Sequence, residues 1–219
     1  MPIKVIDLTQ LLNEKISVYP DTVAPTFKVS NTVEKDGFTE IQITMASHTG
    51  THVDAPCHIL QNGKSLDRLP ADKFIGNAMI IDCRGKDEIN LQFLQPFEQK
   101  ITKVEFILFF TGWQYKWSTQ NYFDNCPVPT REAALWLTNF KLKGIGVDAF
   151  SLDKITSALI VNEENLPNHH ILLGKEILLI ENLTHLDLLP DGNFTFLCFP
   201  LKIENADGSP VRAVAMVTE

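Results

Sequence analysis

The sequence predicts an α/β (α+β) protein built on a mixed, largely antiparallel sheet or barrel with short flanking helices. Many short segments show strand-like apolar patterns, whereas few segments carry a helical period for more than two turns. The chain has 219 residues, 44% of them hydrophobic, which is enough for one sizeable core. No repeat, low-complexity tract or linker-like change of composition divides it. Residues 1–219 are therefore expected to form a single domain.

The first part of the chain is predicted to form strands. Residues 3–8 read as a short strand. Residues 26–33 and 38–46 alternate apolar and polar side chains around an Asp36-Gly37 turn, which predicts a hairpin. The continuous apolar run over 77–83 indicates a buried strand.

The second part alternates helices with strands. Asn90 and Thr130 are suitable N-caps for helices over 90–97 and 130–140, and Pro167 opens a short helix that Gly174 closes. Apolar runs predict buried strands over 104–110, 144–148 and 176–180, followed by a closing antiparallel hairpin over 193–200 and 210–217 with a turn at Asp207-Gly208.

Charge and the N-terminal sequence exclude several classes of partner. The net charge is −8 and no Lys/Arg run is present, which argues against nucleic acid or an anionic membrane surface. The N-terminus lacks an apolar signal region, no apolar stretch reaches membrane-spanning length, and the four cysteines form no CxxC pair. We expect a cytoplasmic protein that acts on a small molecule.

The most informative stretch is a row of histidines with an aspartate. His48, His52, Asp54 and His58 all occupy even-numbered positions, so in an extended segment they share one face with Gly50. A helix with two histidines four residues apart is the rival interpretation. Gly50 and a proline would interrupt that helix, and β-branched neighbours favour an extended backbone. We therefore expect a strand running into a tight loop, with Gly50 leaving a gap where a metal or substrate approaches the main chain.

These residue types are typical of a metal centre. Imidazole nitrogens and carboxylate oxygens are the usual ligands of zinc, manganese and ferrous iron. His48, His52 and Asp54 make a facial set of three, and His58 stands beside it as a proton shuttle. The competing interpretation is a polar loop with local hydrogen bonds, which three clustered histidines disfavour.

A second cluster lies far along the chain. Two adjacent histidines, His169 and His170, fall on the predicted short helix, and Glu181 ends the following apolar strand. A carboxylate at that position is costly to bury unless it is paired or bound to a metal. Spacing alone does not choose between the two histidines.

Residues 48–58 resemble the HxGTHxDxPxH signature of the metal-dependent "putative cyclase" family, which includes bacterial kynurenine formamidase and isatin hydrolase. The resemblance covers nearly the whole chain and implies a swivelling β/β/α fold. It implies a ligand histidine on a helix and a ligand glutamate twelve residues later, which selects His169 and Glu181. It also implies that Tyr19 lines the substrate pocket, where many relatives carry tryptophan.

The resemblance further implies an arylformamidase, a metal-dependent hydrolase that acts on an N-formyl-L-kynurenine-like amide in tryptophan catabolism. A metal-activated water is the nucleophile and His58 moves the proton. One or two zinc ions are implied, with manganese as the other possibility. Alternatives are a hydrolase of a cyclic imide or lactone, and a non-catalytic metal- or metabolite-binding relative. A homodimer or homotetramer is implied as well.

Overall fold

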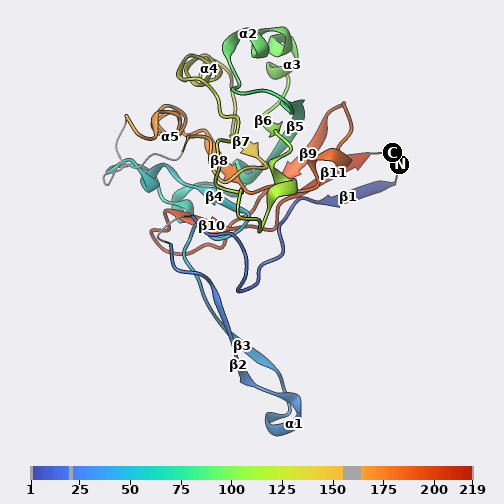
Figure 1. The fold of residues 1–219 in the computed structure, drawn as a ribbon, viewed down its shortest axis with the longest axis vertical. Helices are drawn as coiled ribbons and strands as arrows, with labels where there is room; N and C mark the ends of the chain where they lie inside the picture. The colour runs from blue at the N-terminus through green and yellow to red at the C-terminus, as the bar shows by residue number, and fades with distance from the viewer. Residues whose placement is uncertain (1, 20–21, 155–163, 219) are drawn as a thin grey trace.

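The computed structural model describes residues 2–19, 22–154 and 164–218. A nine-stranded sheet in the order β1-β11-β9-β5-β6-β7-β8-β4-β10 forms its centre (Figure 1). The strands β5 to β8 pair in parallel and the remaining pairs are antiparallel, so the predicted mixed, largely antiparallel sheet is confirmed. The strand bounds are β1 Ile3–Asp7, β4 His52–Asp54, β5 Ile75–Asp82, β6 Phe106–Phe110, β7 Gly144–Val147, β8 Leu178–Glu181, β9 Phe194–Leu197, β10 Gly208–Pro210 and β11 Val214–Thr218.

Two apolar cores form because successive side chains of the buried strands point to opposite faces of the sheet. On β6, Ile107 and Phe109 belong to the core beneath the helices, whereas Phe106 and Leu108 belong to the core on the other face. The first core is covered by short helices, as Figure 1 shows. These helices are α2 Leu91–Leu94, α3 Glu98–Ile101, α4 Arg131–Leu137 and α5 Pro167–Leu173.

The predicted helix caps are confirmed. The side chain of Asn90 accepts a hydrogen bond from the Phe93 amide at 2.9 Å, and the Thr130 hydroxyl accepts one from the Ala133 amide at 3.2 Å. The helix that begins after Asn90 is divided, because a 3₁₀ turn containing Pro96 separates α2 from α3. Proline has no amide hydrogen to continue the helical ladder.

The predicted N-terminal hairpin is also confirmed and stands apart from the main sheet. Among the described residues, its strands β2 (Thr26–Asn31) and β3 (Glu40–Thr44) pair only with each other. One helical turn, α1 (Val33–Asp36), joins them, and Gly37 ends it with φ of 80°. Figure 1 shows this ribbon extending away from the rest of the molecule.

The prediction for the C-terminal segments was partly wrong. The strands β9 and β11 do pair antiparallel, but the chain between them first crosses to the opposite edge of the sheet, where β10 is the last strand. There β10 pairs with β4, so Asp207-Gly208 leads into a strand instead of turning a hairpin. Within the described residues, no helix is both long and apolar enough to span a bilayer.

Candidate active site

The candidate site is built around β4, which lies between β8 and β10. In the antiparallel register His52 is directly opposite Glu181, and Asp54 is opposite Gly208. Directly opposed residues share a face of the sheet, as do residues two apart. The register therefore brings His52, Asp54 and Glu181 together from segments far apart in the sequence.

The predicted strand and tight loop are both present, but the strand is short, so the even-numbered residues from His48 to His58 do not share one extended face. Only His52–Asp54 is a strand, and a 3₁₀ turn begins at Pro56. Gly50 has φ of +66°, a value that favours glycine, and a Cβ there would lie 2.3 Å from the Leu12 side chain. Gly50 does border the cavity described below. The glycine is required, however, by its backbone conformation and by the contact with Leu12.

His48 and His52 both reach Asp54. His48 Nδ1 lies 2.7 Å from Asp54 Oδ1, and His52 Nε2 lies 3.3 Å from the same oxygen. His52 donates from Nδ1 to the Gly50 carbonyl oxygen at 2.8 Å, so Nε2 is the ring nitrogen that faces the carboxylates. His52 Nε2 is also 3.5 Å from Glu181 Oε2.

His169 completes the cluster from α5. Its Nδ1 donates to Asp153 Oδ2 at 2.8 Å, which turns Nε2 towards the site. That Nε2 lies 3.6 Å from Asp54 Oδ2 and 3.5 Å from Glu181 Oε1. His170, the other histidine of the pair, joins no metal-type cluster in the described part of the chain.

The donor atoms form two sets that share Asp54. One set is His48, His52 and Asp54, the other is Asp54, His169 and Glu181, and within each set the donor atoms lie within 4.8 Å of one another. Three imidazoles and two buried carboxylates facing one another are the donors preferred by zinc and manganese. The residues present thus fit a divalent ion, and the shared aspartate fits two.

Electrostatics also favour a cation at this position. Burial alone would lower the pKa of His48 and His52, but the adjoining Asp54 carboxylate raises these values to about 9 and about 10. Burial and Asp54 oppose ionisation of Glu181, yet the neighbouring imidazoles hold its pKa below the usual value. The carboxylates are thus ionised at neutral pH and attract positive charge into the site.

His58 borders the cluster together with an aspartate that sequence analysis missed. The imidazoles of His58 and His48 have centroids 4.0 Å apart. Asp207 Oδ2 lies 3.0 Å from His48 Nε2 and 3.5 Å from His58 Nδ1, which makes these three residues a further donor set. Burial lowers the pKa of His58, so its imidazole is neutral at pH 7. From the sequence, Asp207-Gly208 was predicted to be a turn. Asp207 lies beside His48 because β10 pairs with β4, a long-range pairing that the sequence did not predict.

A buried hydrogen-bond network fixes the strand ends that carry the ligand-type residues. Asn182 follows Glu181 with φ of 58° and donates from Nδ2 to the Gly50 carbonyl oxygen at 2.9 Å. The Tyr122 hydroxyl donates to Asn182 Oδ1, and the Thr51 hydroxyl donates to the Asn182 carbonyl oxygen at 2.7 Å. The network thus ties β8 to the segment that precedes β4.

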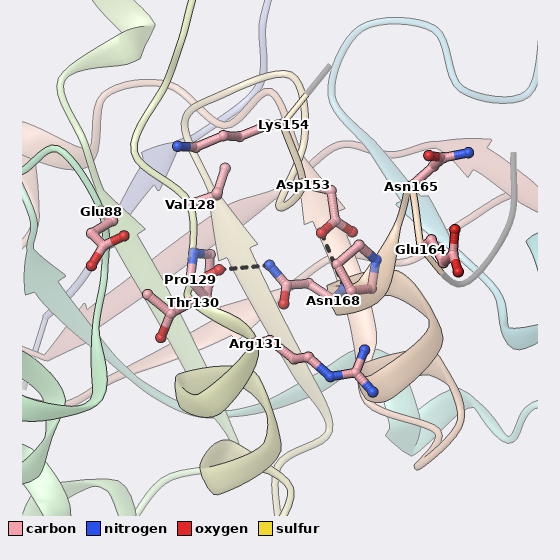
Figure 2. A pocket seen from close by; sticks show the side chains of 11 residues that line it. Glu88, Val128, Pro129, Thr130, Arg131, Asp153, Lys154, Glu164, Asn165 and Asn168 are labelled. Carbon is pink, nitrogen blue, oxygen red and sulfur yellow. Dashed lines mark hydrogen bonds between the residues drawn. The ribbon is translucent and has the colours of Figure 1, made fainter. Parts of the chain in front are cut away.

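Asp153 and Asn168 form hydrogen bonds that fix His169 on the side away from the carboxylates. Asp153 accepts the backbone amides of Asn168 and His169 at 3.0 and 2.9 Å, besides the imidazole. Asn168 donates from Nδ2 to the carbonyl oxygens of Pro129 and Leu152 at 2.8 and 2.7 Å. Figure 2 shows Asp153 and Asn168 in the lining of a hollow of about 250 Å³. Neither residue was predicted to support the site, since a single Asp in a loop or a single Asn in the first turn of a helix gives no sequence signal.

A cavity of about 350 Å³ opens onto the cluster. His48, His52, Asp54, His58, His169 and Glu181 line its polar side. Its apolar side is made by Val18, Tyr19, Ile59, Phe123, Phe150 and Leu166. Tyr19, predicted to line a substrate pocket, borders this cavity with 42% of its surface exposed. The two residues that follow it, Pro20 and Asp21, lie outside the described residues. A polar end with an apolar wall suits a small aromatic ligand.

Known proteins resemble this chain along nearly its whole length. The family model described as "Putative cyclase" matches residues 6–154. A kynurenine formamidase from Bacillus cytotoxicus is 35% identical over 210 residues, which cover 95% of each chain. Isatin hydrolase A from Labrenzia aggregata, solved bound to benzyl benzoate, has a TM-score of 0.87 at 28% identity, covering 99% of this chain and 94% of that one. A structure described as a predicted metal-dependent hydrolase from Bacillus stearothermophilus has a TM-score of 0.79 at 25% identity, covering 99% of both chains.

Proposed function

This chain belongs to the cyclase family of metal-dependent hydrolases, and we propose that it hydrolyses a small aryl formamide such as N-formyl-L-kynurenine. The observation that carries the proposal is the pair of donor sets that share Asp54 at the polar end of an apolar-walled cavity. The kynurenine formamidase of Bacillus cytotoxicus, at 35% identity, supports the choice of a formamide.

We assign the metal to His48, His52, Asp54, His169 and Glu181, with one or two zinc ions expected and manganese as the alternative. A divalent ion bound there would act as a Lewis acid and lower the pKa of a water from about 15.7 to about 7. Residues of the chain orient the imidazole rings of His52 and His169. The Gly50 carbonyl and the Asp153 carboxylate each hold one ring nitrogen of a histidine and direct the other towards the carboxylates.

His58 is the proposed proton shuttle. Its imidazole borders the cavity, and burial lowers its pKa, so it can accept a proton at neutral pH. His58 takes the proton from the attacking water and returns it to the leaving nitrogen, giving formate and the free amine. Tyr19, Phe123 and Phe150 would hold the aryl ring of the substrate.

Two substitutions separate metal binding from proton transfer. His52→Ala should lose bound metal, because it removes an imidazole that belongs to the donor set with His48 and Asp54. His58→Ala should keep the metal and lower turnover by about 10²–10⁴-fold, the range for losing a general acid–base group. Elemental analysis of protein purified without chelator and an N-formylkynurenine assay measure the two effects. Full metal and full turnover in both variants would contradict the assignment.

The second candidate is hydrolysis of a cyclic imide or lactone. The TM-score of 0.87 with isatin hydrolase A supports it, since the same cavity could admit a fused ring. A panel of aryl formamides, isatin and lactones, compared by kcat/KM, distinguishes the two. Tight metal binding without hydrolysis of any panel member would instead indicate a binding protein.

We also propose a cytoplasmic location and a homodimer or homotetramer. The similarity to bacterial kynurenine formamidases supports an enzyme that meets a free small-molecule substrate.

A further inference from the structure

A second hollow, of about 540 Å³, adjoins the cavity of the candidate site. We call it the lateral hollow; its lining includes Trp113, Lys116, Phe123, Asp124, Phe150 and Lys154. Phe123 and Phe150 line the cavity as well, so the two spaces meet at these rings. The ring centroids are 5.2 Å apart, which makes the two side chains one aromatic boundary. A ligand held in the cavity therefore has the lateral hollow beside it, at this boundary.

The lateral hollow carries charges of a kind that the cavity lacks. Lys116, Lys154 and Asp124 line it, whereas no lysine or arginine is among the described residues that line the cavity. Lys154 also borders the smaller hollow of Figure 2, so Lys116 is the lysine that belongs to the lateral hollow alone. Within the described part of the chain, none of these three side chains forms an ion pair. The lateral hollow thus offers both signs of charge to a ligand.

The wall that carries Lys116 is held in place by its own contacts. Trp113 and Lys116 are the two ends of a 3₁₀ turn, Trp113–Lys116. The Trp113 Nε1–H donates to the Tyr122 carbonyl oxygen at 2.7 Å, which fixes the indole. Lys116 Nζ lies 3.2 Å from the centroid of that indole, a cation–π contact. Because both residues line the lateral hollow, this contact keeps the ammonium group on its wall.

The His/Asp/Glu cluster and the lateral hollow are close enough to act on one side chain. Cys126 is buried and lines the lateral hollow. Burial and the Glu181 carboxylate raise the pKa of the Cys126 thiol to about 12, and the Lys116 ammonium opposes this rise. Electrostatic effects weaken over roughly 10 Å in salt solution, so Glu181 and Lys116 both lie near this thiol. A small ligand bound at the cluster can therefore extend to the lateral hollow.

We propose that the lateral hollow is a subsite for an amino-acid tail on the aryl ring of the substrate. This inference rests on the proposed hydrolysis of an aryl formamide and narrows the substrate to formamides with a zwitterionic tail. In N-formyl-L-kynurenine the α-ammonium and α-carboxylate groups follow a ketone and a methylene on the ring. The ring packs against Phe123 and Phe150. The carboxylate pairs with Lys116 and the ammonium with Asp124, whereas isatin, a fused ring without a tail, places nothing there.

The test uses two substrates that differ only in the tail. N-formyl-L-kynurenine carries it, and 2′-formamidoacetophenone has the same ring, formamide and ketone without the amino-acid group. Lys116→Met removes the ammonium group and keeps an unbranched apolar side chain. It should lower kcat/KM for N-formyl-L-kynurenine roughly tenfold, mainly through KM, because a hydrogen bond between charged groups is lost. The kcat/KM for 2′-formamidoacetophenone should not change. Asp124→Asn, at an exposed position, should show the same selective loss.

Lys86→Met is the matched control. The Lys86 ammonium also lies over an aromatic ring, 4.9 Å from the Phe93 centroid, but Lys86 lines neither the cavity nor the lateral hollow. Its replacement should leave kcat/KM for both substrates at the wild-type value. The proposal would be overturned by equal losses for the two substrates in Lys116→Met and Asp124→Asn, by no loss in either variant, or by the same selective loss in Lys86→Met.

Product binding separates this inference from the proposed function. Calorimetric titration of the purified protein with L-kynurenine and with 2-aminoacetophenone compares ligands with and without the tail and requires no hydrolysis. Wild type should bind L-kynurenine roughly tenfold more tightly, and Lys116→Met should bind the two ligands alike. A wild-type protein that hydrolyses neither formamide would contradict the proposed function, and the titration would still decide whether the lateral hollow holds the tail. Equal affinity of wild type for the two ligands would overturn the inference.

Discussion

Replacing Asp153 with asparagine tests whether a buried carboxylate positions His169. Asp153 Oδ2 accepts both the imidazole Nδ1–H and the backbone amide of His169, at 2.8 and 2.9 Å, and Oδ1 accepts the Asn168 amide at 3.0 Å. An asparagine has only one oxygen to share among these donors. It keeps both bonds to His169 only if its amide NH₂ is turned towards the Asn168 amide.

The cost follows from this geometry. The favoured rotamer leaves the buried Asn168 amide without an acceptor, which costs about 1–3 kcal/mol. In a protein of this size 1 kcal/mol shifts the melting temperature by about 2–4 °C, so a decrease of roughly 2–12 °C is expected. The imidazole also loses its charged acceptor, and such losses weaken metal binding by about 10–100-fold. That range corresponds to about 1.4–2.8 kcal/mol of binding free energy.

Asp148→Asn is the matched control. Asp148 is also buried, and it accepts the amide and hydroxyl of Thr111 at 2.8 and 2.6 Å and the Gln114 amide at 3.3 Å. It belongs to none of the donor sets in the described residues. Its replacement should lower the melting temperature similarly and leave the metal Kd unchanged. Competition with a chromogenic chelator gives the Kd. Wild-type affinity in Asp153→Asn, or an equal loss in Asp148→Asn, would refute the reasoning.

Two further perturbations test the packing and the charge of the site. A Cβ at Gly208 would lie 2.6 Å from the His48 ring, so Gly208→Ala should displace that imidazole and lower metal affinity at least tenfold in the same competition assay. Gly192→Ala is the control, because nothing lies within 4 Å of a Cβ there, and it should leave the affinity unchanged. Equal affinities in the two variants would contradict this account. Although burial opposes protonation, Asp54 raises the pKa of His48 and His52 to about 9 and about 10, above the value of 6.5 for unfolded histidine. The contribution of these two protonated imidazoles to the free energy of unfolding is complete below pH 6.5 and is lost as the pH rises through 9 and 10. Urea unfolding of the metal-free protein should therefore show a decreasing free energy of unfolding from pH 7 to pH 10. A constant value across this range would exclude protonated imidazoles in the metal-free protein.

The local part of the site was predictable from the sequence. Residues 48–58 place their histidines and aspartate within one short span, and a span of that length can bring side chains together whatever the fold. The distant pair was harder, because spacing left His169 and His170 equivalent. The structure distinguishes them by Asp153, which accepts from His169 Nδ1 and so directs Nε2 to the carboxylates.

The residues that were missed depend on long-range pairing. Asp207 reads as a turn residue because Asp-Gly is a strong turn signal. It enters the site because β10, three residues long, pairs with β4 across a separation of about 150 positions. So short a strand carries no pattern of its own. For the hairpin of β2 and β3, alternation predicted the strands correctly, but periodicity only shows that one face is apolar and not what covers it.

Around β4, the fold places each of three carboxylates beside a histidine, and this pairing sets the protonation of the site. Asp54, Glu181 and Asp207 come from three neighbouring strand segments, and each lies against a histidine. When no ion is bound, the protonated imidazoles of His48 and His52 supply the positive charge beside these carboxylates, since both have raised pKa values despite their burial. A divalent ion must displace those protons to reach the ring nitrogens, so metal affinity should increase with pH until the imidazoles are neutral. His58 differs, because burial lowers its pKa and leaves a free lone pair beside the site at neutral pH. The same fold thus keeps two kinds of histidine a few ångströms apart: His48 and His52, which would exchange protons for a metal, and His58, which would stay available to move a proton.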